Sequence, residues 1–182
     1  TFYAAEDADV ALQLTHIFEK ELKKEELDRF FNSVEMPLLP VLLAMEFNGT
    51  FVNGKMLETM SAELGKKIDH LVNDIQNEAG TEFNVNSTQQ LASVLFDIKG
   101  LPEIKKRSTA ENVLHRLKNE NLIPGLILEY RKLNKLKNTY IDALPSLINH
   151  ETKRIHSTFS QTITSTGRLS SSNPNFQNIP IR

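Results

Sequence analysis

KMLETMSAELGKKIDHLVNDIQNEAG, residues 55–80, carries the strongest helical pattern in this chain. Its large apolar residues recur at steps of three and four, at Leu57, Met60, Leu64, Ile68, Leu71 and Ile75. An α-helix repeats every 3.6 residues, so this spacing places them on one stripe. Gly80 is the expected end, because the left-handed conformation that closes many helices costs glycine least. The stretch predicts a long amphipathic helix that needs an apolar partner.

Residues 124–144 have the same character and supply that partner. Their apolar seam consists of Leu126, Tyr130, Leu133, Tyr140 and Leu144. Each helix exposes one stripe that it cannot bury alone, so we expect a long antiparallel helical hairpin. The fold class that follows is mainly α.

Two shorter helices are expected between these long ones, at the tip of the hairpin. Ser87 and Gln90 have the spacing of a capping box, and so do Ser108 and Glu111. A helix start presents free N–H groups and a partial positive charge, which suits a bound phosphate. Ordinary helix capping explains the same residues without any ligand.

The N-terminal part of the chain is also expected to be helical. Apolar and polar residues alternate at helical spacing over residues 1–24, and a second helix is expected over residues 36–46. Residues 51–54 then form a short extended piece that ends in a turn. The first helix starts without an initiator methionine or a cap, so we interpret the chain as a fragment of a longer protein.

The last stretch, TSTGRLSSSNPNFQNIPIR at residues 164–182, is unusually polar. Hydroxyls and amides can donate and accept hydrogen bonds at once, which suits base edges and backbone oxygens, and Arg168 offers a planar fork of donors. The sequence favours a loop that lines a binding site, and an inert surface loop is the alternative.

Composition excludes several classes of protein. The chain has 40% hydrophobic and 24% charged residues and no cysteine, so disulfides and thiolate metal sites are impossible. The longest unbroken apolar runs, such as residues 41–45, are too short to cross a bilayer. We therefore expect a soluble intracellular protein of one or two small domains.

Charge is strongly polarised along the chain. Residues 1–98 hold 17 Asp and Glu against 7 Lys and Arg, a net charge of -10, and residues 99–182 hold 6 against 14, a net charge of +8. Four cations fall within two turns of the second long helix, at Arg131, Lys132, Lys135 and Lys137. Like charges one helical turn apart repel by about 0.2–0.5 kcal/mol per pair, which an anionic partner would relieve. Lysines that simply keep the hairpin soluble are the alternative.

Several motifs, in this order, resemble the family A DNA polymerases, the family of bacterial DNA polymerase I. They are FNVNS at 83–87, LEYRKL at 128–133, KLKNTY at 135–140, TGRLSS at 166–171 and QNIP at 177–180. YAAED at 3–7 is similar to the third motif of the proofreading 3'-5' exonuclease domain. The resemblance covers nearly the whole chain. Asn173 and Phe176 depart from it, since the family usually has Asp and Leu there.

The resemblance implies a domain plan. Residues 1–35 would be the C-terminal helical tail of an exonuclease-like domain, and residues 36–154 the thumb subdomain with its base. Residues 155–182 would begin the palm with a short β segment. The palm aspartates that bind metal and the fingers lie downstream in the family, so this chain alone should not polymerise.

It also implies DNA-binding residues. Arg168 would reach the minor groove at the primer terminus, where acceptors on base edges look alike for every correct pair. Asn175, Gln177 and Asn178 would lie beside it, and Arg182 near the entering nucleotide. On the thumb, the residues expected to hold backbone phosphates are Asn84, Ser87, Thr88, Arg131 and Lys135.

The remaining implications concern cofactors and partners. Asp7 would bind one of two exonuclease metals with Tyr3 orienting the attacking water. Mg²⁺ would serve the complete enzyme, and none is expected to be held firmly by this piece. Primer-template duplex DNA and dNTP would be the partners of a monomeric, cytoplasmic enzyme that does not contact membranes. A free-standing helical binding module that borrowed the thumb is the alternative to a polymerase segment.

Overall fold

The structure is a computed structural model that describes the backbone of residues 2–179 and the side chains of residues 5–179. The chain divides into two compact units. The first unit contains the described residues up to Thr50 together with His156–Asn178, and the second unit contains Phe51–Ile155 and Ile179.

The long helix expected over residues 55–80 is confirmed as α4 (Gly54–Ala79) in the second unit. Gly80 closes it in the left-handed conformation with φ of 75°, as predicted. The start differs from prediction, because Asn53 caps the helix by accepting a hydrogen bond from the Met56 amide at 3.2 Å. Gly54 is therefore the first residue of α4 and does not end a turn.

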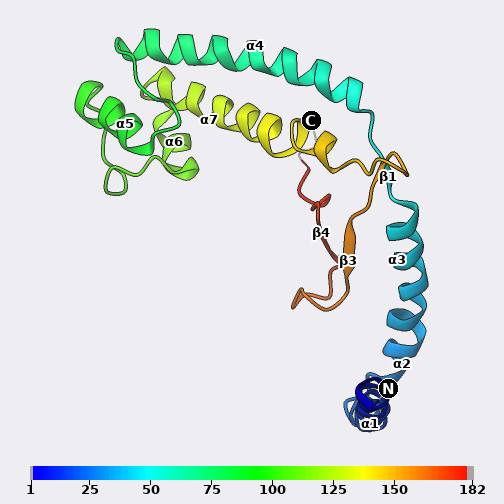
Figure 1. Ribbon diagram of the computed structural model, residues 1–182. Helices are drawn as coiled ribbons and strands as arrows, with labels where there is room; N and C mark the ends of the chain where they lie inside the picture. Colours follow the sequence, from blue (N-terminus) through cyan, green and yellow to red (C-terminus); the bar gives the residue numbers. More distant parts are fainter. Residues whose placement is uncertain (1, 180–182) are drawn as a thin grey trace. The chain divides into compact units, whose positions relative to one another are not determined.

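The partner helix is also present, with different bounds. α7 (Leu122–Lys135) starts two residues before Pro124 because Asn121 caps it. It continues as the π-helix η3 (Leu136–Ile141) and ends before Leu144, which begins the 3-10 helix η4 (Leu144–Leu147). Figure 1 shows α4 and α7 running antiparallel, which confirms the predicted hairpin.

The core of the second unit lies between the hairpin and the short helices at its tip, which are α5 (Thr88–Ala92), the π-helix η2 (Ser93–Ile98) and α6 (Glu111–Leu117). Ile75 of α4, Leu95 of η2, Leu114 of α6 and Ile127 of α7 are all fully buried there. The predicted seam named Leu126, but its neighbour Ile127 is the buried residue and Leu126 is only partly buried.

One of the two predicted capping boxes forms in part and the other is wrong. Ser87 Oγ accepts the Gln90 amide at 3.3 Å, whereas the Gln90 side chain turns to the Asn84 amide and not back to Ser87. Ser108 does not cap α6, because Ala110 occupies the N-cap position and has no side-chain acceptor. Ser108 Oγ instead accepts the Ala110 amide at 3.3 Å and closes a local turn.

The first unit begins with α1 (Phe2–Lys24). α2 (Asp28–Phe30), the π-helix η1 (Phe31–Glu35) and α3 (Met36–Asn48) then form one continuous helical run, longer than the helix predicted at 36–46. By length and composition this run, with mean hydropathy 1.3, could cross a membrane, although no unbroken apolar stretch in it is long. The buried core helices of soluble proteins have the same length and composition, whereas only 6% of this run's apolar window is buried in the described part of the chain.

The strands are short. β1 (Thr50–Phe51) pairs with β2 (Arg154–Ile155), and β3 (Thr158–Ser160) pairs antiparallel with β4 (Ser170–Ser172) in the first unit. The register places Phe159 opposite Ser171 and Ser160 opposite Ser170. The polar stretch from residue 164 is therefore not all loop, because β4 lies within it.

Replacing Ile127 by Ala should destabilise the second unit. The side chain is fully buried between the helices, and deleting its methyl and methylene groups leaves a cavity. We expect a loss of about 2–5 kcal/mol in the free energy of unfolding, measured by urea denaturation followed by circular dichroism. Leu122→Ala, at a side chain that is 68% exposed, is the control and should change little. Equal losses in the two variants would contradict this placement of the core.

Candidate nucleic-acid interface

The segment that precedes α5 is tied to both helices of the hairpin. Gln76 of α4 donates from Nε2 to the Phe83 carbonyl oxygen at 3.1 Å. Tyr130 of α7, whose ring is buried, donates from its hydroxyl to Asn86 Oδ1 at 2.9 Å. The helical hairpin therefore holds residues 83–86 in place, and the polar side chains of this segment face solvent from that position.

Hydrogen bonds within the segment order its predicted site residues. Asn84 Oδ1 accepts the Asn86 amide at 3.0 Å, and the Asn84 amide donates to Gln90 Oε1 at 2.7 Å. The Asn84 carbonyl accepts the Ser87 amide at 2.8 Å. Asn84 and Thr88 are exposed and Ser87 is half-buried, so all three lie at one accessible helix start.

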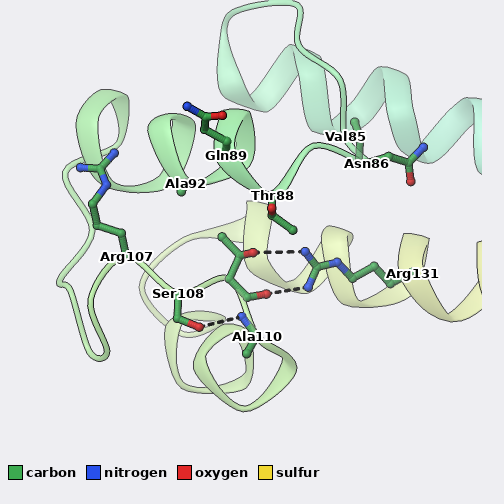
Figure 2. Close-up of a pocket in the computed structure, with 10 residues that line it drawn as sticks. Val85, Asn86, Thr88, Gln89, Ala92, Arg107, Ser108, Ala110 and Arg131 are labelled. Atoms are coloured by element: carbon green, nitrogen blue, oxygen red, sulfur yellow. Dashed lines mark hydrogen bonds between the residues drawn. The ribbon is translucent and has the colours of Figure 1, made fainter.

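A cavity of about 640 Å³ lies next to this helix start (Figure 2). It brings Thr88 and Arg131 together, while Asn84 and Ser87 do not line it. Its lining consists of Val85, Asn86, Thr88, Gln89, Ala92, Arg107, Ser108, Thr109, Ala110 and Arg131. None of these described lining residues carries a carboxylate. The cavity therefore combines two cations with neutral hydrogen-bonding groups.

The guanidinium of Arg131 forms hydrogen bonds within the protein. Its Nη1 donates to the Thr109 carbonyl oxygen at 2.6 Å and its Nη2 to Thr109 Oγ1 at 3.3 Å, as the dashed lines in Figure 2 show. Partial burial lowers the pKa of the Arg131 guanidinium, an effect that the nearby Glu111 carboxylate opposes. Arg131 thus holds Thr109 in the wall of the cavity and also gives the cavity a positive charge.

Lys135 lies in a neighbouring groove of about 660 Å³ between α6 and α7. It shares this groove with Arg131, Lys132, His115, Leu128, Glu111 and Glu129. Lys135 is exposed and forms no ion pair within the described part of the chain. Lys137 differs, because its ammonium group lies 2.6 Å from Asp142 Oδ2. Of the basic cluster, Lys132 and Lys135 are therefore the exposed lysines that form no ion pair in the described part of the chain.

Arg107, at the other side of the cavity, is held by η2. Its guanidinium donates to both carboxylate oxygens of Asp97, at 2.6 and 2.7 Å, and lies 5.7 Å from the centre of the Phe96 ring. Hydrogen bonds from Arg107 and then from Ser93 lower the pKa of the Asp97 carboxyl to about 2. This bidentate pair anchors the basic link that precedes α6.

The remaining predicted DNA contacts lie in the first unit, around the β3–β4 hairpin. Arg168 is exposed, and its guanidinium has no hydrogen bond or ion pair to the described part of the chain. Its carbonyl oxygen accepts a hydrogen bond from Thr164 Oγ1. The loop is therefore fixed through its backbone while the Arg168 side chain projects outward.

Gln177 and Asn175 fold back on this hairpin. Gln177 Nε2 donates to the Leu169 carbonyl at 2.6 Å, and its Oε1 accepts the Ser171 amide at 3.2 Å. Asn175 Oδ1 accepts the Gln177 amide at 2.9 Å. The Gln177 side chain thus bonds the backbone of residues 169 and 171 as a neighbouring strand would. Asn178 is exposed beside it. Arg182 lies outside the described residues.

Asp7 is exposed on α1, and the side chain of its expected partner Tyr3 lies outside the described residues. Among the side chains that the structure describes, no three His, Asp or Glu residues come together as metal ligands. The described residues of this chain therefore do not fit a complete magnesium site.

Sequence reasoning did not name Asn86, Gln89, Ser108 or Thr109 as site residues, although they line the cavity. Asn86 lies inside a motif that was identified, and Ser108 was noted only as a cap. No spacing signal connects residues 108–109 with residue 131, because the contact crosses 22 positions.

Comparisons with known proteins identify similar chains. The model of DNA polymerase family A matches residues 54–182. DNA polymerase I of Pseudomonas aeruginosa is 46% identical over 187 residues, which cover 99% of this chain and 20% of the relative. The thermostable DNA polymerase I of Thermus thermophilus is 45% identical over 186 residues, covering 98% of this chain and 22% of the relative. The chain spans about a fifth of the length of these curated relatives.

A solved structure has the same fold. It is the POL domain of Pol1 from M. smegmatis in complex with DNA primer-template and dNTP. The TM-score is 0.83 at 34% sequence identity, and the match covers 94% of this chain and 31% of that chain.

The Asp97–Arg107 pair should survive into strong acid. Because the folded pKa of Asp97 is below its ordinary value of 3.8, its stabilising effect is complete above pH 3.8 and is lost as the pH falls toward 2. Carboxyl carbon NMR should give an Asp97 pKa of about 2. The protection factors of the amides over residues 99–110 should fall only below pH 3.8 in the unaltered chain, and should be lower throughout the range above pH 3.8 in Asp97→Asn. An Asp97 carboxyl that titrates at 3.8 would contradict the pairing.

Proposed function

This chain belongs to DNA polymerase family A, and we propose that it forms the part of a DNA polymerase I that grips duplex primer-template DNA and contacts the primer terminus. In this proposal residues 1–35 are the tail of a 3'-5' exonuclease-like domain, residues 36–154 the thumb with its base, and residues 155–182 the beginning of the palm. The complete protein acts in DNA replication and repair synthesis.

The observation that carries this proposal is the cavity at the tip of the helical hairpin. Arg107 and Arg131 line it with hydroxyl and amide side chains, and the described lining residues include no carboxylate. The charge of Arg107 is paired with Asp97, which does not line the cavity, so Arg131 is the lining cation without an ion pair in the described part of the chain. A site built this way attracts an anion and hydrogen-bonds its oxygens, which are the properties of a backbone phosphate. The segment is also rigidly held by Gln76 and Tyr130, so binding requires little ordering.

The thumb residues in this proposal bind phosphates along one strand. Asn84, Ser87 and Thr88 meet a phosphate at the start of α5, while Lys135 continues the track along α7. Arg131, which is hydrogen-bonded to Thr109 in the cavity wall, contributes positive charge. Such contacts position the duplex and confer no sequence preference, as template-directed synthesis requires.

The palm residues in this proposal recognise the primer end. Arg168 extends from a loop fixed through its backbone, so its guanidinium fork can reach acceptors in the minor groove that every correct base pair presents. Asn175, Gln177 and Asn178 lie next to the primer or template, with Gln177 also maintaining the loop. Arg182 lies near the dNTP.

The chemical step belongs to residues outside this chain. We assign Mg²⁺ to the complete polymerase, where divalent metals stabilise the charge that develops on the transferred phosphate. The described residues do not assemble a group of metal ligands, so the chain by itself should bind Mg²⁺ weakly and should not polymerise. Asp7 would supply one ligand of an exonuclease metal site and Tyr3 would orient the water.

The complete protein is proposed to be a monomeric cytoplasmic enzyme of the bacterial nucleoid without a membrane contact. The apolar run from Asp28 to Asn48 is consistent with this, because Glu35 within it accepts a hydrogen bond from Gln161 and Glu46 accepts one from the Phe159 amide of β3. A membrane-spanning helix would have to break those contacts or carry them into the bilayer.

Binding of the 182-residue chain to a primer-template should be weak and strongly dependent on salt, because each neutralised phosphate contributes a slope of about 0.9 to log K against log salt. Lys135→Ala should weaken binding at low salt and reduce the slope by about one. Fluorescence anisotropy across a salt series measures both quantities.

Lys67→Ala is the matched control, since Lys67 is an exposed lysine of α4 that lines neither of the two cavities at the tip. It should leave the slope unchanged. No binding of the unaltered chain at low salt would eliminate the grip proposed for the isolated chain and favour a module with another partner.

Arg168→Ala, made in a complete polymerase that carries this chain, should slow nucleotide incorporation far more than it weakens duplex binding. The reason is that one minor-groove contact at the primer end adds little to many phosphate contacts but aligns the reacting end. Single-turnover incorporation and equilibrium anisotropy measure the two effects. Equal losses would mean that Arg168 is only an anchor.

A further inference from the structure

We propose that Glu46 of α3 is a positioning residue that holds the β3–β4 hairpin and thereby sets where Arg168 lies. Its consequence for DNA synthesis rests on the proposed function. The structural part of the proposal, that Glu46 holds the loop that carries Arg168, is based on contacts within the first unit and can be tested without DNA.

Glu46 contacts one residue of β3 and one residue just before it. Its carboxylate Oε1 accepts the Phe159 amide at 2.6 Å, and its backbone carbonyl lies 2.8 Å from His156 Nδ1. The carboxylate is half-buried and spans 113 positions of sequence to reach a backbone group in a strand. A carboxylate that accepts a backbone N–H makes a charge-assisted hydrogen bond, which is stronger than a bond between neutral groups.

Glu35 provides a second attachment on the same side of the helical run. Gln161 donates from Nε2 to the Glu35 carbonyl oxygen at 3.0 Å and also to the Glu35 carboxylate. Glu46 follows Glu35 by eleven positions, about three helical turns, so both lie on the side of the helical run that faces the strand. The chain is thus attached to the helical run at Phe159 in β3 and again at Gln161, just after β3 ends.

The register of the hairpin carries this attachment to Arg168. Phe159 lies opposite Ser171 and Ser160 opposite Ser170, only two residues after Arg168. Ser157, whose hydroxyl lies 3.0 Å from the Ser172 carbonyl and 2.7 Å from the Pro174 carbonyl, fixes the other end of β4. A strand of three residues has few ladder bonds of its own. The attachment to α3 therefore determines the position of β3 and, through β4, of the Arg168 loop.

The first experiment uses the 182-residue chain without DNA. Glu46→Ala should raise amide exchange at Phe159, over residues 168–172 and at no part of α4 or α7, by roughly tenfold or more, as expected for a lost hydrogen bond to a charged group. Glu46→Gln keeps an acceptor oxygen and should restore most of the protection. Glu58→Ala, at an exposed glutamate of α4, is the control. Unchanged exchange over 168–172 in Glu46→Ala would overturn the proposal.

The second experiment measures single-turnover nucleotide incorporation in a complete polymerase that carries this chain. If Glu46 acts through Arg168, Glu46→Ala lowers the rate with little change in duplex affinity, and Glu46→Gln restores it. The same Glu46→Ala substitution should have almost no further effect in an Arg168→Ala background, because non-additivity identifies groups that act together. Losses that multiply in the double variant would overturn the proposal.

The two experiments separate this inference from the proposed function. If Arg168→Ala does not change incorporation, the primer-terminus role of Arg168 fails, and the exchange experiment alone decides whether Glu46 holds the loop. If Arg168→Ala slows incorporation but Glu46→Ala changes neither exchange nor rate, the proposed function stands and the positioning role of Glu46 is wrong.

Discussion

The packing of α4 against α7 is the interaction on which the second unit depends. Each helix has one apolar stripe, and Ile75 and Ile127 bury theirs completely only when the helices lie side by side. Helices of this length draw most of their stability from such packing and not from intrinsic propensity. The pairing also determines where the polar site is built, because Gln76 and Tyr130 extend from the packed pair to fix the segment before α5.

Burial and charge are divided between different residues of α7. Tyr130 packs inward and its neighbour Arg131 turns to the cavity wall, while Lys135, one turn later, is exposed. One helix therefore contributes to the core, to the wall of a cavity and to a charged surface. The first unit uses another arrangement, in which helical glutamates hold a short hairpin whose Arg168 side chain projects to solvent. In both units, the backbone that carries the cationic side chains is held in place by contacts with neighbouring helices.

The sequence predicted those elements whose signal is local. The repeat from Leu57 to Ile75, the stop at Gly80 and the cap at Ser87 follow from neighbours within a few residues, and all three are confirmed. The predictions were wrong where a competing local bond was available. Asn53 started α4 earlier than expected, and Ser108 closed a turn and did not cap α6. The π-helical end of α7 was also missed, because its hydrogen-bond register has no signature in side-chain spacing.

The helical hairpin and the polarity of charge follow from the amino-acid sequence alone, because periodicity and composition are properties of the chain. The tertiary structure determines which polar side chains form hydrogen bonds within the protein. Arg131 reaches Thr109 across 22 positions, Glu46 reaches Phe159 across 113, and Gln177 folds onto β4. No spacing rule predicts such contacts, since they depend on how folded backbones meet. They use the side chain of Arg131 within the protein, while Lys135 and Arg168 are among the cations that stay exposed.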